Sequence, residues 1–78
     1  METKIQYSLP VDSHVMVTIY NLHGQEIKTL VNDYQNAGKY TTMWDGRDRR
    51  GNEVGAGVYF YAMEYGKERL IRKLTVLP

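Results

Sequence analysis

The stretch VYFYAMEYGKERLIRKLTVL (58–77) indicates the fold more strongly than any other part of the sequence. Its first part, Val58 to Tyr65, is rich in aromatic residues, which favour strands over helices. Gly66-Lys67 then fits a two-residue type II′ hairpin turn, which requires glycine at its first central position. The chain returns as a strand over Arg69 to Leu77. The stretch therefore predicts an antiparallel β-hairpin.

Upstream of this hairpin, apolar and polar side chains alternate with a period of two, which is typical of strands. The predicted strands cover residues 5–9, 15–20, 27–31 and 39–44. The strand over 15–20 is apolar on both sides near its end, so we expect it to be central. Asn32 to Gly38 is read as a polar connection. Asp45 to Gly57 contains four glycines (46, 51, 55 and 57) and is read as a long connection with room for one short strand.

Six strands with room for a seventh, and a turn signal roughly every 8–12 residues, are typical of a sandwich or barrel. We predict an all-β, immunoglobulin-like antiparallel β-sandwich of six to seven strands. The 78 residues favour one domain over 1–78, because two domains would each be too small to hold a core. At this length only roughly 63% of the unfolded surface is buried, so the core should be thin.

The expected core contains most of the large side chains on the strand faces. It comprises Tyr7, Val17, Ile19, Trp44, Tyr59 and Tyr61. The strand over 58–65 is apolar on both faces, because Val58, Phe60 and Ala62 alternate with Tyr59, Tyr61 and Met63. One face must meet the other sheet. The second face is covered by long side chains or forms an association surface over Val58, Phe60 and Ala62. Carbohydrate stacking on exposed aromatics is a further alternative, less favoured than packing.

The sequence offers little for metal, cofactor or catalytic chemistry. It has no cysteine, which excludes disulfides and thiolate zinc sites. Asp45, Asp48 and Asn52 are the best candidates for calcium ligands, but their spacing does not fit an alternating Asp-x-Asp-x-Asp-Gly loop, and three arginines lie among them. Asx-turns that close the loop are the favoured reading. His14 and His23 have no partner at a ligand spacing, and no serine fits a nucleophile turn. We therefore predict no cofactor and no enzyme.

Ten Lys and Arg against nine Asp and Glu give a net charge of +1. A nucleic-acid interface usually needs a larger positive excess, so the basic residues near 47–50 and 67–73 are expected to form a solvated face. We predict neither a nucleic-acid partner nor a small-molecule substrate. Glu2 and Lys4 interrupt the N-terminus before any apolar run, so no signal peptide is predicted in this chain.

Three runs and the terminal TVLP carry a resemblance to a known family. They are IQYSLPVDSHVMVTIYNLHGQEIKTLV (5–31), NAGKYTTMWDGRDRRGNEVGAGVYFY (36–61) and MEYGKERLIRKL (63–74). The chain resembles the C-terminal Ig-like sorting domain of type IX secretion cargo proteins, which is similar to the Ig-like domain of the flagellar hook-capping protein. The sequence departs from the sorting pattern in two ways: it lacks an Asn-Pro-rich lead-in and ends in Pro78.

This resemblance implies a non-catalytic module that marks a cargo for export or attaches it to the cell surface. Its partners would be an outer-membrane shuttle and a sortase-like peptidase, and its location would be secreted or at the cell surface through a signal on the parent chain. The alternative is a structural spacer or assembly domain, like the hook-cap Ig module. Such a domain is also expected to self-associate as a dimer, because long terminal strands can pair edges or exchange between copies.

Overall fold

The structure is a computed structural model and describes residues 2–78, which form six strands and no helix. The strands are β1 (Thr3–Leu9), β2 (Ser13–Tyr20), β3 (Glu26–Gln35), β4 (Gly38–Trp44), β5 (Gly57–Tyr65) and β6 (Glu68–Val76). The described residues thus contain no helix that could cross a membrane. All strand pairs are antiparallel, which confirms the predicted all-β class.

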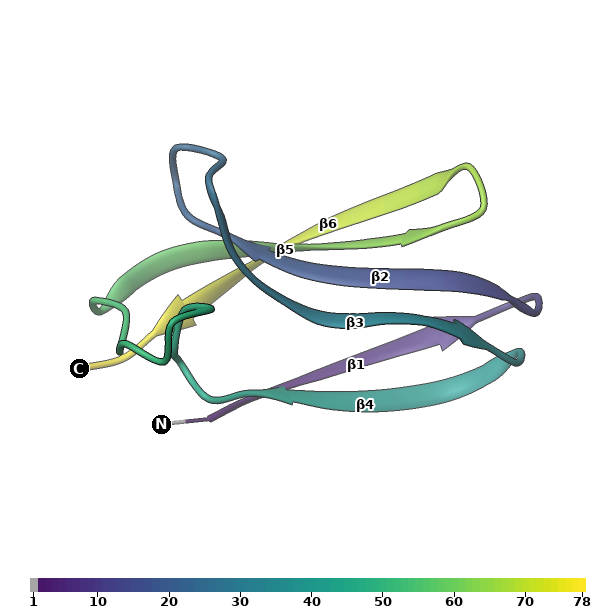
Figure 1. Cartoon of the computed structure of the whole chain (residues 1–78), viewed down its shortest axis with the longest axis horizontal. Coiled ribbons are helices and arrows are strands. Elements are labelled where there is room, and N and C mark those ends of the chain that lie inside the picture. The colour runs from purple at the N-terminus through teal and green to yellow at the C-terminus, as the bar shows by residue number, and fades with distance from the viewer. Residues whose placement is uncertain (1) are drawn as a thin grey trace.

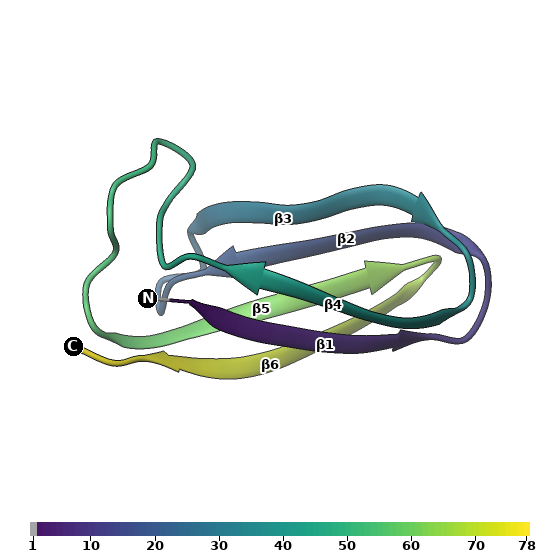
Figure 2. The same ribbon diagram turned by 90° about the horizontal axis from the view of Figure 1, so that it is seen from below.

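The strands form two layers of unequal width (Figure 1). One sheet contains β1 and β4 only, and the other has the order β3-β2-β5-β6. In the view from below, β1 and β4 lie in front of the larger sheet (Figure 2). The start of β1 and the end of β6 lie at the same end of the molecule in both views, as does the loop between β4 and β5.

The hydrophobic core fills the space between the two sheets, because alternate side chains of each strand point inward. Its buried members come from every strand except β3. They are Ile5, Leu9, Val15, Val17, Ile19, Trp44, Met63, Leu74 and Val76. β2 contributes three fully buried aliphatic residues, since it is paired on both edges and lies under the small sheet. The prediction that this strand is central is therefore confirmed.

The third strand is longer than the sequence pattern predicts. It continues through Asn32 to Gln35, residues that were assigned to a polar connection, and Ser13 pairs with Gln35 at its end. β3 is an edge strand with exposed residues at 32–34, so polar side chains face solvent while the backbone still pairs with β2. Two register shifts between β2 and β3 also break the strict alternation.

The predicted hairpin turn is confirmed. Tyr65 pairs with Glu68 across the two-residue connection, and Gly66 has a φ of 55°, as a primed turn requires at its first central position. The segment between β4 and β5 contains no strand. It has only one isolated bridge, between Arg47 and Glu53, so the sandwich has six strands.

Candidate functional site

The loop after Trp44 is organised by side-chain acceptors. Oδ1 of Asp45 accepts from the backbone N–H of Arg47 at 3.0 Å. Oδ1 of Asp48 accepts from the backbone N–H groups of Arg50 at 2.9 Å and Asn52 at 3.0 Å. These are the Asx-type turns expected from the sequence, and they engage one carboxylate oxygen of each aspartate with backbone N–H groups.

Cationic side chains form ion pairs with carboxylates of the same loop. Nζ of Lys28 lies 3.8 Å from Oδ1 of Asp45, and the guanidinium of Arg47 lies 3.4 Å from Glu53. Within residues 2–78, no three His, Cys, Asp or Glu side chains are grouped as metal ligands. The loop is thus self-bonded, which means that Asp45, Asp48 and Asn52 take part in hydrogen bonds within the loop itself.

The predicted core residues divide into two groups in the structure. Val17, Ile19 and Trp44 have no exposed surface, whereas Tyr7, Tyr59 and Tyr61 are partly buried and pack against the core. The indole N–H of Trp44 donates to the carbonyl of Arg47 at 2.9 Å, which joins the core to the Asp45–Gly57 loop.

The outer face of β5 differs from the expected association surface. Val58 and Phe60 are partly exposed, but Ala62 is only 1% exposed and offers no accessible side chain. Ala62 lies on a central strand between Thr18 of β2 and Ile71 of β6. It lines a groove of about 310 Å³ together with Phe60, Arg69 and Ile71. Val58, Phe60 and Ile71 therefore keep accessible apolar atoms on this face, and Ala62 is removed from the proposed surface.

The histidines and the basic residues are dispersed. His14 faces Oδ1 of Asn32, and His23 lies in the turn capped by Asn21. The loop over 45–56 and the Gly66-Lys67 turn lie at opposite ends of the molecule, which separates the basic residues of the loop from Lys67 (Figure 1).

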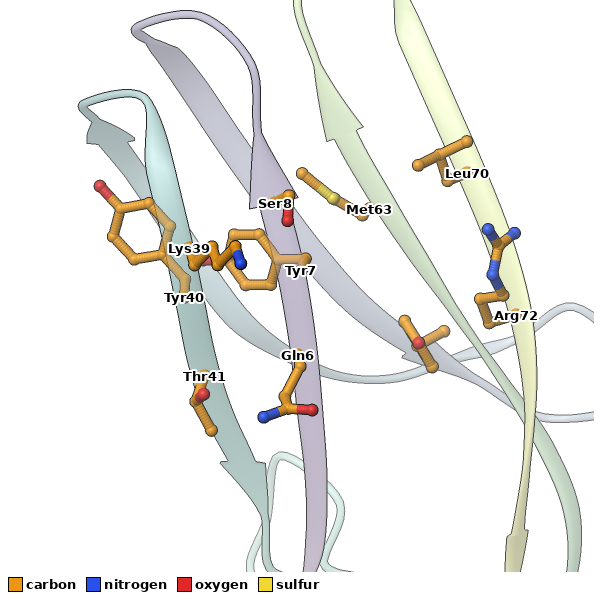
Figure 3. A pocket seen from close by; sticks show the side chains of 10 residues that line it. Gln6, Tyr7, Ser8, Lys39, Tyr40, Thr41, Met63, Leu70 and Arg72 are labelled. Carbon is orange, nitrogen blue, oxygen red and sulfur yellow. The ribbon is translucent and has the colours of Figure 1, made fainter.

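A larger groove lies between β1 and the β5–β6 hairpin, and we call it the β1–β6 groove (Figure 3). It has a volume of about 580 Å³. Its lining residues come from four strands and are Gln6, Tyr7, Ser8, Lys39, Tyr40, Thr41, Tyr61, Met63, Leu70 and Arg72. In Figure 3, β4 lies on one side of β1, and Met63, Leu70 and Arg72 lie on the other.

Burial along β6 shows why this groove exists. The inner-face residues Leu74 and Val76 are buried. Leu70 lies on the same face, four residues before Leu74 and nearer the hairpin turn, and it is 42% exposed. The two sheets therefore enclose a wedge that is closed near Val76 and open near Leu70. Sequence reasoning missed the groove, because alternation assigns Leu70 to a face without showing how far the opposite sheet extends.

Tyr7 forms part of the wall of this groove. Its hydroxyl donates to Oε1 of Gln35 at 2.7 Å, and its ring stacks on Tyr40 with centroids 5.4 Å apart. Burial raises the pKa of the Tyr7 hydroxyl above its ordinary value, although the hydrogen bond to Gln35 opposes the rise. The residue is thus a fixed, neutral structural element near neutral pH.

The sandwich, its short connections and its self-bonded loop define a class: a small immunoglobulin-like structural domain. The model of the FlgD Ig-like domain family matches residues 1–68, and the chain belongs to this family, which is a structural, non-enzymatic module. A crystal structure of FlgD from P. aeruginosa superposes with a TM-score of 0.77 and 29% sequence identity. The match covers 96% of this chain and 59% of that chain. A search of the curated proteins finds no match.

Proposed function

We propose that the protein serves as a structural assembly or spacer domain of a hook-cap-type protein, and that it acts through its shape and surfaces. The observation that carries this proposal is the match over nearly the whole chain to FlgD, at 29% identity. The hydrogen bonds of the long loop between β4 and β5 support it, since Asp45 and Asp48 are engaged with backbone groups of the loop itself.

Type IX sorting receives no support from the comparisons, which favour the hook-cap alternative. The outer-membrane shuttle, the sortase-like peptidase and a location outside the cell stay untested predictions. They would gain support if residues 1–78, fused to a reporter, directed its export in a bacterium that has type IX secretion. Retention of the reporter in the periplasm would count against them.

Domain exchange tests the proposed function directly. Residues 1–78 would replace the matching Ig-like part of FlgD in P. aeruginosa, and hook formation and swimming would be measured. We expect the chimera to restore hook assembly. An unrelated Ig-like domain of similar size, placed at the same position, separates the two roles: restoration by both indicates a spacer, and restoration by this chain alone indicates assembly. A folded and expressed chimera that forms no hooks would overturn the proposal.

Self-association is a separate proposal and needs its own measurement. Light scattering over a concentration series would show a rise in mass for a dimer. A constant mass near 9.1 kDa would exclude it.

A further inference from the structure

β1 has an unused hydrogen-bonding edge. All seven of its residues pair with β4, from Thr3 opposite Trp44 to Leu9 opposite Gly38, and its other edge pairs with no described strand. In an antiparallel strand, alternate residues direct their N–H and C=O groups to each side, so a free edge is a template for another strand. This edge borders the β1–β6 groove (Figure 3).

The floor of the groove is apolar and is made by inward-facing side chains. Met63 is 3% exposed and lies deepest, and Tyr61 beside it is partly buried. Leu70 pairs with Met63 across β5 and β6 and lies at the open side. A strand that added to β1 would direct alternate side chains onto this floor, because side chains on a strand alternate with a period of two.

The charge of the groove is positive. Lys39 and Arg72 line it, and none of its ten lining residues is a carboxylate. The only hydrogen bond of the Arg72 guanidinium within residues 2–78 is to the carbonyl of its neighbour Ile71, at 3.2 Å. Arg69 on the same strand, by contrast, pairs with Glu64 at 3.3 Å. Arg72 is therefore an exposed cation beside an apolar surface, and it pairs with no carboxylate of the described residues.

The same charges argue against a second copy of this chain as the occupant. Two β1 edges paired across a two-fold axis would bring together two strands that each carry Lys4 and no carboxylate. β1 therefore offers Arg72 of another copy no carboxylate, so the charge pattern favours a different, acidic chain.

We propose that the β1–β6 groove binds an extended acidic segment of a partner protein. The segment adds to the free edge of β1 as a third strand, places alternate apolar side chains on Met63 and Leu70, and sets an Asp or Glu carboxylate against Arg72. Backbone hydrogen bonds supply the orientation, and the Arg72 contact supplies the preference for acidic sequences. This inference goes beyond the structural role proposed above and does not depend on it.

A display library of random ten-residue peptides, selected on the purified chain, tests the proposal. We expect the enriched peptides to carry Asp or Glu within an alternating apolar pattern, and to slow amide hydrogen exchange in β1. Arg72→Glu should weaken binding of a synthesised enriched peptide by about tenfold or more. Arg72→Gln loses the charge but keeps hydrogen-bond donors, so its affinity for the peptide should lie between those of Arg72→Glu and the parent chain. Arg50→Glu is the matched control, since Arg50 is an exposed arginine in the loop at the other end of the molecule, and it should bind as the parent chain does.

Circular dichroism of each variant establishes that it is folded, and Arg72→Gln keeps the test valid if the charge reversal does not fold. The proposal is overturned if no peptide is enriched, if the enriched peptides lack acidic residues, or if the folded Arg72 variants bind as tightly as the parent. Exchange protection confined to other strands would also overturn it. A dimer that protects β1 without any peptide would replace the partner segment by a second copy.

Discussion

The rings of Trp44 and Tyr59 meet edge to face, with centroids 5.6 Å apart and an interplanar angle of 64°. This contact joins the end of the small sheet to the start of β5 in the large one. Trp44 is fully buried, whereas Tyr59 is partly exposed and donates through its hydroxyl to the carbonyl of Gly55 at 2.7 Å. The pair thus closes the sandwich at the end where the long loop crosses between the sheets.

Replacing Tyr59 by leucine should destabilise the protein more than replacing it by phenylalanine. Phenylalanine keeps the edge-to-face contact and loses only the hydrogen bond to Gly55, whereas leucine loses both. Aromatic pairs contribute about 0.5–1.5 kcal/mol beyond buried area, so the two variants should differ by that amount in their free energies of unfolding. Urea denaturation followed by Trp44 fluorescence measures the difference. Equal stabilities would show that the ring contact contributes nothing specific.

Asp48→Ala should lower the free energy of unfolding by about 1–2 kcal/mol, because two backbone N–H groups lose their acceptor. Asp48→Asn is the matched control and should retain most of the stability, since its amide oxygen accepts in the same place. We expect the melting temperature of the parent chain to be the same in millimolar calcium and in a chelator. A saturable rise with calcium would restore the ion-binding interpretation of this loop.

Tyr7 should contribute to a loss of stability at alkaline pH. Its folded pKa is raised by burial, so above the ordinary value of 10.0 the unfolded chain releases the proton more readily than the folded chain. Stability is then fully present below that pH and declines as the pH rises through the folded pKa. In Tyr7→Phe the fall in the free energy of unfolding between pH 9 and 11 should be smaller than in the parent. The variant should also be about 1 kcal/mol less stable at neutral pH, because Gln35 loses its donor. An unchanged alkaline slope in Tyr7→Phe would contradict a raised pKa of the Tyr7 hydroxyl in the folded chain.

Gly66→Ala should cost about 1–2 kcal/mol, because its φ of 55° lies in the left-handed region, which side chains disfavour. Gly55→Ala provides the comparison: no atom lies within 4 Å of the added Cβ, and its backbone does not have a positive φ. That variant should be neutral or slightly stabilising, since alanine restricts the unfolded chain. Thermal denaturation of both variants checks the contrast, and equal melting temperatures would contradict the turn assignment.

Local patterns in the sequence predict much of the fold. Alternation located five of the six strands closely, and glycine at position 66 predicted both the turn and its type. The limit of β3 was missed, because Asn32 to Gln35 lie on an exposed edge where pairing with β2, rather than hydrophobic pattern, keeps the strand extended. The Asx-turns were readable from Asp45 and Asp48, since they depend on neighbours only two to four residues away.

The surfaces were much less predictable. Alternation distinguished the two faces of β5, but Ala62 is buried between Thr18 and Ile71, which belong to the two neighbouring strands. The β1–β6 groove depends on the unequal width of the two sheets and on the divergence of a hairpin from β1. Neither quantity has a local sequence signature. The residues around Arg72 therefore do not show that it lines a groove without a carboxylate.

The position of the chain ends determines how the domain would transmit mechanical load. β1 begins and β6 ends at the same end of the sandwich (Figures 1 and 2). Any polypeptide continuing beyond both ends would therefore enter and leave side by side, and the domain would stand out from it as a lateral arm. Tension along such a polypeptide would pass mainly across the base of the arm, away from the hairpin tip.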